Sequence, residues 1–176
     1  GEDVERTVKK ADLQNPNINQ MLAKFKLHSE LPNVKGTVLW YAKAVVDNVG
    51  NYQNVLRNVY WKHPALHPLM PFIDGKSPKK VKGLKLMDID GDKVLFWSKP
   101  KGKGWKDEAV KYVVYRFDDG KVNIGDASKI VGITSDCFYK LDKTGVAHVG
   151  RKTVFAVTAL DRMSNESKPC KKKVKL

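Results

Sequence analysis

Residues 110–117 read VKYVVYRF and residues 152–160 read KTVFAVTAL, and both runs are rich in β-branched and aromatic side chains. Such runs predict β-strands. Five further runs fill the same half of the chain, at residues 84–86 (LKL), 94–97 (VLFW), 130–134 (IVGIT), 137–141 (CFYKL) and 167–174 (SKPCKKKV). Asp90-Gly91 between the first two of these is a hairpin turn signal. About seven short strands in about a hundred residues predict a mainly β protein built as a β-sandwich.

The first part of the chain has a different pattern. After a polar start, Asn15-Pro16 is typical of a helix N-terminus, and Ile18, Met21, Leu22 and Phe25 follow at helical spacing until Leu31-Pro32-Asn33 ends the helix. Residues 36–42 (GTVLWYA) form a short apolar run that predicts a strand buried on both faces. A second helix is predicted from Tyr52, Val55, Leu56, Val59 and Tyr60, with Asn51 placed to cap it.

A single helix-strand-helix repeat cannot cover the edges of its own strand. We therefore interpret the first part of the chain as the last piece of a larger α/β domain. Residues 1–60 are expected either to pack on the sandwich or to pair with a second copy of the chain.

The 176-residue chain has a net charge of +14, and residues 76–176 carry 24 of its 33 Lys and Arg residues but 12 of its 19 Asp and Glu residues. A basic surface of this kind can attract nucleic acid, anionic lipid or acidic polysaccharide. Solubility is the plainer explanation, because the lysines are spread over several turns and few arginines accompany them. No apolar run is long enough to predict a membrane span.

Residues 60–76 (YWKHPALHPLMPFIDGK) resemble the joint of a bacterial family of glycosyl-hydrolase-like proteins. Members of that family join a family-ten-like (β/α)8 barrel to a C-terminal fibronectin type III-like module. Residues 36–42, 112–117 (YVVYRF) and 157–167 (VTALDRMSNES) also resemble segments of this family. Trp97 near the end of the second strand and the alternation of Tyr112 and Val114 are similar to a fibronectin type III module. Thr153 stands where such modules usually carry a tyrosine, which departs from the pattern.

The resemblance implies a C-terminal fragment with three parts: residues 1–62 as a helix-strand-helix remnant of the barrel, residues 63–78 as a proline-rich connector, and residues 79–176 as the fibronectin type III-like sandwich. It implies extracytoplasmic placement, in the periplasm, on the cell surface or secreted. The missing N-terminal barrel of the parent chain is the first expected partner.

Glycoside hydrolysis needs two carboxylates on either side of the scissile bond. The barrel part offers only Asp47, and a (β/α)8 barrel draws its catalytic groups from several strands. We therefore predict no catalytic residue and no cofactor in this chain. Trp40 and Tyr41 at the end of the predicted strand are candidates for sugar contact, although a place in the core explains them equally well. Trp105 in the lysine-rich segment 99–106 is a third candidate, with an ordinary flexible loop as the alternative.

Metal binding is not favoured by the sequence. His63 and His67 have a helical spacing, but Pro64 and Pro68 argue against a helix there. Residues 88–92 (DIDGD) imitate the start of a calcium loop but place the glycine too early, so a polar turn is the better interpretation. Whether Cys137 and Cys170 pair is left open by the sequence.

Three functional hypotheses follow. The first is a non-catalytic accessory module that positions or spaces the catalytic barrel of a glycoside hydrolase. The second is a carbohydrate-binding module that uses exposed aromatic residues such as Trp105 to hold a polysaccharide. The third is non-specific binding of polyanions or nucleic acid, which charge alone motivates and no nucleic-acid fold signature supports.

Overall fold

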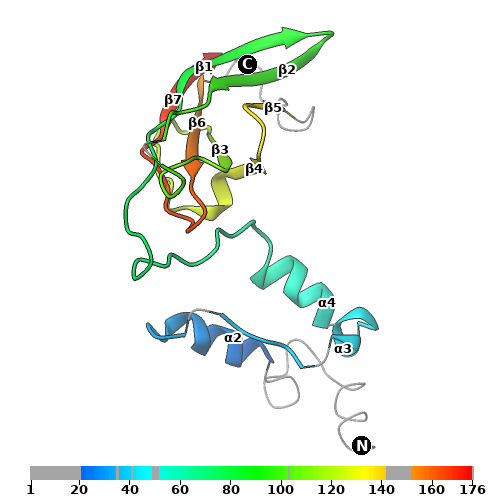
Figure 1. The fold of residues 1–176 in the computed structure, drawn as a ribbon. Coiled ribbons are helices and arrows are strands. Elements are labelled where there is room, and N and C mark those ends of the chain that lie inside the picture. The colour runs from blue at the N-terminus through cyan, green and yellow to red at the C-terminus, as the bar shows by residue number, and fades with distance from the viewer. Residues whose placement is uncertain are drawn as a thin grey trace, which may run out of the picture. The chain divides into compact units, whose positions relative to one another are not determined.

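The computed structural model describes residues 21–34, 36–40, 42–48, 52–102, 104–141 and 152–175. The chain divides into two compact units, Gly1–His63 and Pro64–Leu176. The described part of the first unit contains helices, and the second unit contains the strands (Figure 1). Most residues of regular structure are therefore in strands, as predicted.

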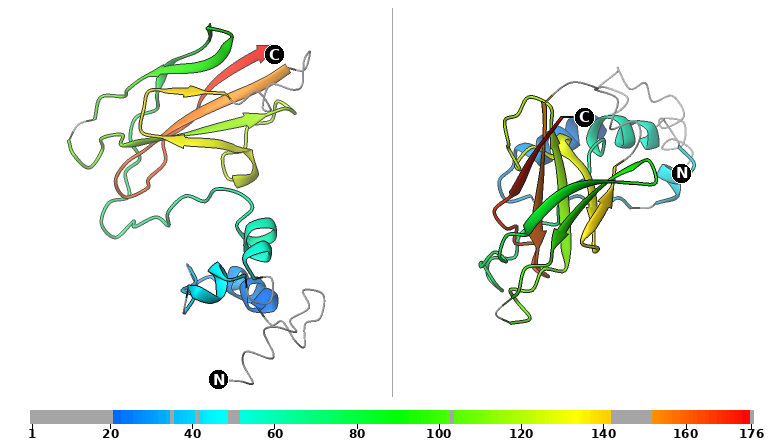
Figure 2. Two further views of the ribbon diagram at one scale, coloured as in Figure 1. Left: turned by 90° about the vertical axis from the view of Figure 1, so that its right-hand side faces the viewer. Right: turned by 90° about the horizontal axis from the view of Figure 1, so that it is seen from above.

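The second unit consists of two antiparallel sheets (Figure 2). The first has the order β1-β2-β5, with bounds Lys82–Ile89, Asp92–Ser98 and Phe138–Lys140. The second has the order β4-β3-β6-β7, with bounds Ile130–Thr134, Lys111–Phe117, Lys152–Leu160 and Cys170–Lys175. A short 3₁₀ turn, η3 (Ala127–Lys129), precedes β4. This arrangement is consistent with a β-sandwich, and each predicted run overlaps one of these strands.

The hairpin between β1 and β2 turns at Asp90-Gly91, as predicted. Ile89 pairs with Asp92, which leaves a two-residue loop. Both loop residues have positive φ angles, 52° at Asp90 and 82° at Gly91. Two successive positive φ values are what a type I′ turn requires, and Asp-Gly adopts them with little strain.

The inner core lies between the two sheets. Trp97 on β2 packs edge-on against Tyr112 on β3, with ring centroids 5.4 Å apart. Burial of apolar area of this kind is the main stabilising term of the fold. The buried residues of this cluster come from both sheets and the adjoining loops: Val81, Leu84, Leu95, Trp97, Ala109, Tyr112, Val114, Leu141, Phe155, Val157 and Ala159. Tyr112 and Val114 both belong to this cluster and so share the inner face of β3.

A second core covers the outer face of the four-stranded sheet, which the sequence analysis did not anticipate. Its buried members are Val113, Tyr115, Phe117, Ile130, Val154, Ala156 and Leu160. Leu66 from the proline-rich segment and Val122 and Ile124 from the loop after β3 pack against them. Strands β3 and β6 are thus buried on both faces, and the proline-rich segment belongs to the packing of the second unit.

A close contact joins the two sheets at Gly132. A Cβ atom at this position would lie 2.2 Å from Cε2 of Tyr139 on β5. The Tyr139 hydroxyl donates a hydrogen bond of 2.6 Å to the carbonyl of Val131 on β4. Only glycine leaves room for the ring in this position, because ordinary carbon contacts lie near 3.5–4.0 Å.

The described part of the first unit begins with α2 (Met21–Glu30), which ends just before Leu31-Pro32 as predicted. The predicted start at Asn15-Pro16 and Ile18 lies outside the described residues. A short helix, α3 (Lys43–Val46), comes next. The second predicted helix is present as α4 (Tyr52–Val55), which continues into a π-helical turn, η2 (Leu56–Tyr60).

Only part of the predicted apolar face of that second helix is covered. Val55 and Leu56 are buried, whereas Val59 is 64% exposed. The predicted cap, Asn51, lies outside the described residues. The side-chain oxygen of Asn48 instead accepts a hydrogen bond of 3.0 Å from the backbone N–H of Gln53 in the first turn of α4. A short polar side chain near a helix start satisfies an N–H that has no partner inside the helix.

The predicted buried strand at residues 36–42 is not formed, and this prediction was wrong for the chain by itself. Its described residues, 36–40 and 42, are in no strand, and Val38 is 92% exposed. A strand is held by hydrogen bonds to a neighbouring strand. No other strand is present in the described part of this unit, so the apolar run has nothing to pair with.

Candidate functional site

Of the two aromatic residues proposed for sugar contact in the first unit, the structure describes one. Trp40 is 96% exposed, so it is not a core residue here. Tyr41 lies outside the described residues. Trp40 therefore presents an almost free indole to solvent, but from an irregular segment rather than from a strand end.

The first unit also has an aromatic hollow that the sequence analysis missed. It has a volume of about 290 Å³ and is lined by Phe25, His28, Ser29, Val34, Gly36, Thr37, Tyr60 and Trp61. Phe25 lies 4.9 Å from Tyr60 and 6.3 Å from Trp61 between ring centroids. Nδ1 of His28 and Oγ1 of Thr37 are 3.1 Å apart, within hydrogen-bonding distance. The adjacent Tyr60-Trp61 pair was the available sequence signal.

Trp105 belongs to the long loop that connects β2 to β3. Its side chain is 60% exposed. The ammonium of Lys106 lies over the indole ring, 5.6 Å from the ring centroid, a cation–π geometry. The loop therefore presents an aromatic surface and a positive charge side by side.

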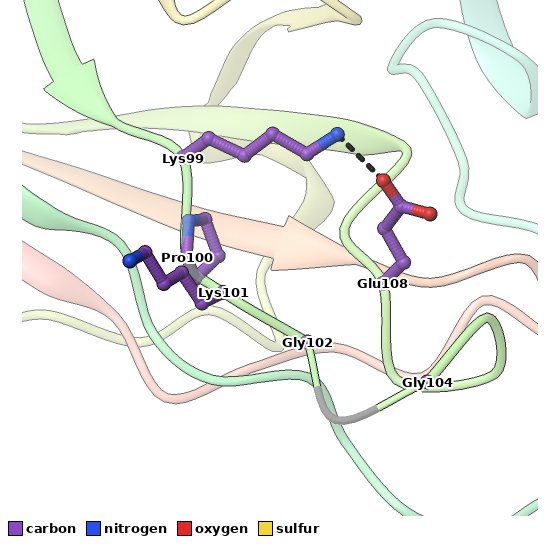
Figure 3. A pocket seen from close by; sticks show the side chains of 6 residues that line it. All are labelled: Lys99, Pro100, Lys101, Gly102, Gly104 and Glu108. Carbon is purple, nitrogen blue, oxygen red and sulfur yellow. Dashed lines mark hydrogen bonds and ion pairs between the residues drawn. The ribbon is translucent and has the colours of Figure 1, made fainter.

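A hollow of about 480 Å³ lies in the same loop, lined by Lys99, Pro100, Lys101, Gly102, Gly104 and Glu108. Figure 3 shows Lys99 reaching toward Glu108, and the two form an ion pair of 2.7 Å. Lys99 holds the pKa of Glu108 below its usual value, first through the hydrogen bond that it donates and second through its positive charge. The ammonium of Lys101 points away from this pair (Figure 3). This ion pair ties the end of β2 to the start of β3.

The loop stands at one end of the sandwich, which we call the basic end. The register brings several segments together there. Lys82 at the start of β1 lies opposite Ser98 at the end of β2, and Lys111 at the start of β3 lies opposite Leu160 at the end of β6. Among the described residues, the cations of the basic end are Lys76, Lys79, Lys80, Lys82, Lys99, Lys101, Lys106, Lys111, Arg162 and Lys168.

The loop that carries Arg162 is held by buried polar contacts. Asp161 is 3% exposed, and its Oδ1 accepts hydrogen bonds from the backbone N–H groups of Met163 and Asn165, at 2.8 and 2.9 Å. The side-chain amide of Asn165 donates to Oδ2 of Asp161 at 2.9 Å and to the carbonyl of Asp74 at 3.0 Å. The loop is thereby bonded to the proline-rich segment.

Glu166 and Ser167 continue this network into the sheet. Oε1 of Glu166 accepts hydrogen bonds from the Tyr115 hydroxyl at 2.7 Å and from Oγ1 of Thr158 at 2.6 Å. Oγ of Ser167 accepts one of 2.9 Å from the N–H of Ala159. The polar residues of the run 159–167 thus support the architecture of the sandwich.

Next to this loop is a smaller hollow of about 160 Å³, lined by Ala65, Leu66, His67, Val110, Lys111, Ile133, Leu160, Asp161, Arg162 and Ser164. His67, one of the two histidines weighed for metal binding, lines it. In the described ranges no group of three His, Cys, Asp or Glu side chains is placed to hold a metal ion. Cys137 and Cys170 are both free thiols.

No helix among the described residues has the length and apolar character needed to cross a membrane. No protein-family model matches the chain. Over 150 residues, or 85% of the chain, the sequence is 31% identical to the glycosyl hydrolase YngK of Bacillus subtilis (strain 168). The chain is a distant relative of a glycosyl hydrolase. It spans 28% of the length of that protein.

Proposed function

We propose that this chain is a non-catalytic accessory module of a larger glycoside hydrolase, and that it positions or spaces a catalytic barrel that precedes it. One observation carries the proposal: most of the chain matches a glycosyl hydrolase, yet the match spans only 28% of that protein. A catalytic (β/α)8 barrel typically needs about 250 residues, so the catalytic carboxylates are expected elsewhere in the parent protein.

The second unit acts in this proposal as a fibronectin type III-like module. The seven strands among its described residues are divided into three and four between two antiparallel sheets, which supports that assignment. The packing of Trp97 against Tyr112 in the inner core also supports it. At the position of the missing tyrosine, the Thr153 hydroxyl donates a hydrogen bond of 3.0 Å to Oδ1 of Asp118, so a polar link is kept at that corner.

The first unit acts as a remnant of the barrel. Exposed apolar side chains are its main feature, and they are Leu27, Leu31, Val38, Trp40, Val46, Val59 and Trp61. A monomeric soluble protein seldom exposes so many large apolar groups over one small region. The missing barrel strands would pair with residues 36–42 and cover this surface, and Trp40 would then stand at a strand end, where it can contact sugar.

The proline-rich segment acts as a fixed joint rather than a free linker. Leu66 packs on the outer core, Pro78 is buried, and the carbonyl of Asp74 accepts the hydrogen bond from Asn165. A joint that is bonded to the sandwich limits the motion of whatever precedes it, which is the requirement for a positioning role.

The test compares this chain with a longer version of the protein that includes the upstream region, on a panel of soluble and insoluble glycans. The longer protein is expected to release reducing sugar, and this chain is expected to release none. Inertness of the longer protein across the panel would contradict the assignment, and so would hydrolysis by this chain alone.

A second measurement concerns the exposed surface of the first unit. By itself the chain is expected to form a homodimer that covers these apolar groups, whereas the longer protein is expected to be monomeric. Light scattering after size exclusion distinguishes the two cases. A monomeric chain whose first unit is rapidly digested while the second stays intact would show that the surface is neither paired nor packed. Extracytoplasmic placement belongs to the same proposal, and cell fractionation of the parent organism checks it.

A further inference from the structure

The two ends of the sandwich differ in the number of ion pairs that their described residues form. At the end opposite the basic end, three ion pairs balance aspartates with cations: Lys93 with Asp88, Arg116 with Asp118 and Lys140 with Asp92, at 2.6–2.8 Å. At the basic end, among the described residues, only the pair between Lys99 and Glu108 is formed. The basic end therefore has fewer ion pairs among its described residues. Cations that form no ion pair lie at both ends, since Lys121, Lys129 and Lys173 have none at the opposite end.

The acidic groups of the basic end are Asp74, Asp107, Glu108, Asp136, Asp161 and Glu166, fewer than its cations. Several of them are already engaged. Glu108 pairs with Lys99, while Asp161 and Glu166 accept hydrogen bonds from backbone and hydroxyl donors. Lys101 and Lys106 are exposed and lie on the same loop as Trp105. A net positive field thus surrounds an exposed aromatic side chain.

The loop is also shaped to present that side chain. Pro100 is buried, and the ion pair between Lys99 and Glu108 closes the base of the loop. Trp105 lies between Lys99 and Glu108 in the sequence and is 60% exposed. An indole ring offers a flat apolar face to the C–H groups of a sugar, and a neighbouring ammonium offers a partner to a negative group on that sugar.

We propose that the basic end binds acidic glycans, polysaccharides whose sugars carry carboxylate groups. Trp105 stacks on a sugar ring, while Lys101 and Lys106 pair with carboxylates along the chain. The inference rests on the proposed function, which it deepens by naming the class of glycan to which the module attaches its enzyme.

The composition of the basic end favours carboxylated sugars over nucleic acid. Arginine is the side chain that best matches a phosphate with two parallel hydrogen bonds. The described residues of this surface include one arginine, Arg162, and nine lysines. Single-stranded nucleic acid is usually held by several aromatic side chains in a row. The loop between β2 and β3 carries one, Trp105.

The experiment measures binding of the whole chain to oligogalacturonate by calorimetry. The methyl ester of the same oligosaccharide is the ligand control, because it keeps the sugar backbone and removes the charge. Duplex DNA and vesicles of anionic phospholipid are tested in parallel. All titrations are made at low salt and again at about 0.15 M salt, where charges separated by more than about 8 Å are largely screened.

Two variants and a matched control locate the site. Trp105→Ala is expected to weaken binding of oligogalacturonate by about tenfold. The double variant Lys101→Ala with Lys106→Ala is expected to weaken it by a similar factor. The control double variant, Lys121→Ala with Lys173→Ala, removes the same charge from the opposite end and is expected to leave the affinity within about twofold.

The proposal is overturned if the two lysine double variants weaken binding equally, because the charge would then act only in bulk. Unchanged affinity of Trp105→Ala also overturns it, as does equal binding of the methyl ester or tighter binding of DNA or vesicles. Loss of binding on Trp40→Ala instead would place the sugar contact in the first unit. Each of these results leaves the hydrolase test of the longer protein unaffected, so the two proposals fail separately.

Discussion

One side-chain hydrogen bond of Asn165 attaches the proline-rich segment to the sandwich and a second one holds Asp161, and Asn165→Ala removes both of them. The side chain is 5% exposed and donates to Oδ2 of Asp161 and to the carbonyl of Asp74. Truncation leaves Oδ2 of the buried Asp161 without this donor. Hydrogen bonds to charged groups contribute about 1.5–3 kcal/mol, and a neutral one about 1 kcal/mol. We expect a loss of about 2–4 kcal/mol in the free energy of unfolding.

Hydrogen exchange measured by mass spectrometry suits this prediction because it reports on the second unit by itself. The most protected amides of β3 and β6 exchange through global opening of the sheet, so their rate should rise roughly 30- to 900-fold. The segment 64–80 should also become more sensitive to protease, because its bond to the loop is lost.

Asn123→Ala is the matched control. Oδ1 of Asn123 accepts a single hydrogen bond, 3.0 Å from the N–H of Gly125, in an exposed turn. Its loss should change the free energy of unfolding by less than about 1 kcal/mol. Equal effects of the two substitutions, or an Asn165 variant with unchanged exchange and unchanged protease resistance in segment 64–80, would refute the role assigned to this contact.

Three further predictions follow from packing and burial. Gly132→Ala should destabilise the second unit by about 1–3 kcal/mol in urea unfolding, because the added methyl group meets the Tyr139 ring. The same substitution in a Tyr139→Ala background should lower the free energy of unfolding by less, and additive effects of the two substitutions would contradict the contact. Tyr115→Phe leaves Glu166 without one donor and should cost about 1–3 kcal/mol in the same assay, whereas no change would remove that bond from the network. Burial raises the pKa of both Tyr112 and Tyr115 above the ordinary value of about 10. Their neutral forms therefore stabilise the folded state below that pH, and the free energy of unfolding should fall as the pH rises above it. A tyrosine absorbance titration in which every tyrosine ionises together near pH 10 without unfolding would be inconsistent with this.

The acidic-glycan site and the hydrolase assignment supply the functional tests. They involve different surfaces and different assays. The Asn165 variant also bears on the positioning role: in the longer protein, a loosened joint should lower the rate on a polymeric glycan more than on a small soluble glycoside.

Local patterns were sufficient to locate the strands. The hydrophobic runs at 110–117 and 152–160 each contain a strand, because side-chain alternation and β-branching act within a few residues. The turn at Asp90-Gly91 was predictable for the same reason, since its positive φ values depend on the two residues themselves. The end of the first helix before Leu31-Pro32 was also local.

The failure at residues 36–42 shows the limit of such patterns. The run has the composition of a buried strand, but a strand depends on hydrogen bonds to a partner that its own residues do not encode. Without that partner the segment is irregular, and Trp40 is exposed rather than buried. The composition of the segment predicted a preference for strand structure. Whether a strand forms depends on a neighbouring strand, and the described part of the first unit contains none.

The candidate site at the basic end likewise depends partly on local sequence and partly on tertiary contacts. The sequence alone determined the strand runs, the hairpin turn, the excess of lysine and the presence of Trp105 in a basic loop. Only the tertiary structure brought Lys82, Lys111 and Arg162 to the same end of the sandwich as that loop, and only it placed Leu66 over the outer face of the sheet. The physical reason is that backbone preferences act between near neighbours in the chain, whereas strand pairing and core packing join residues far apart in it.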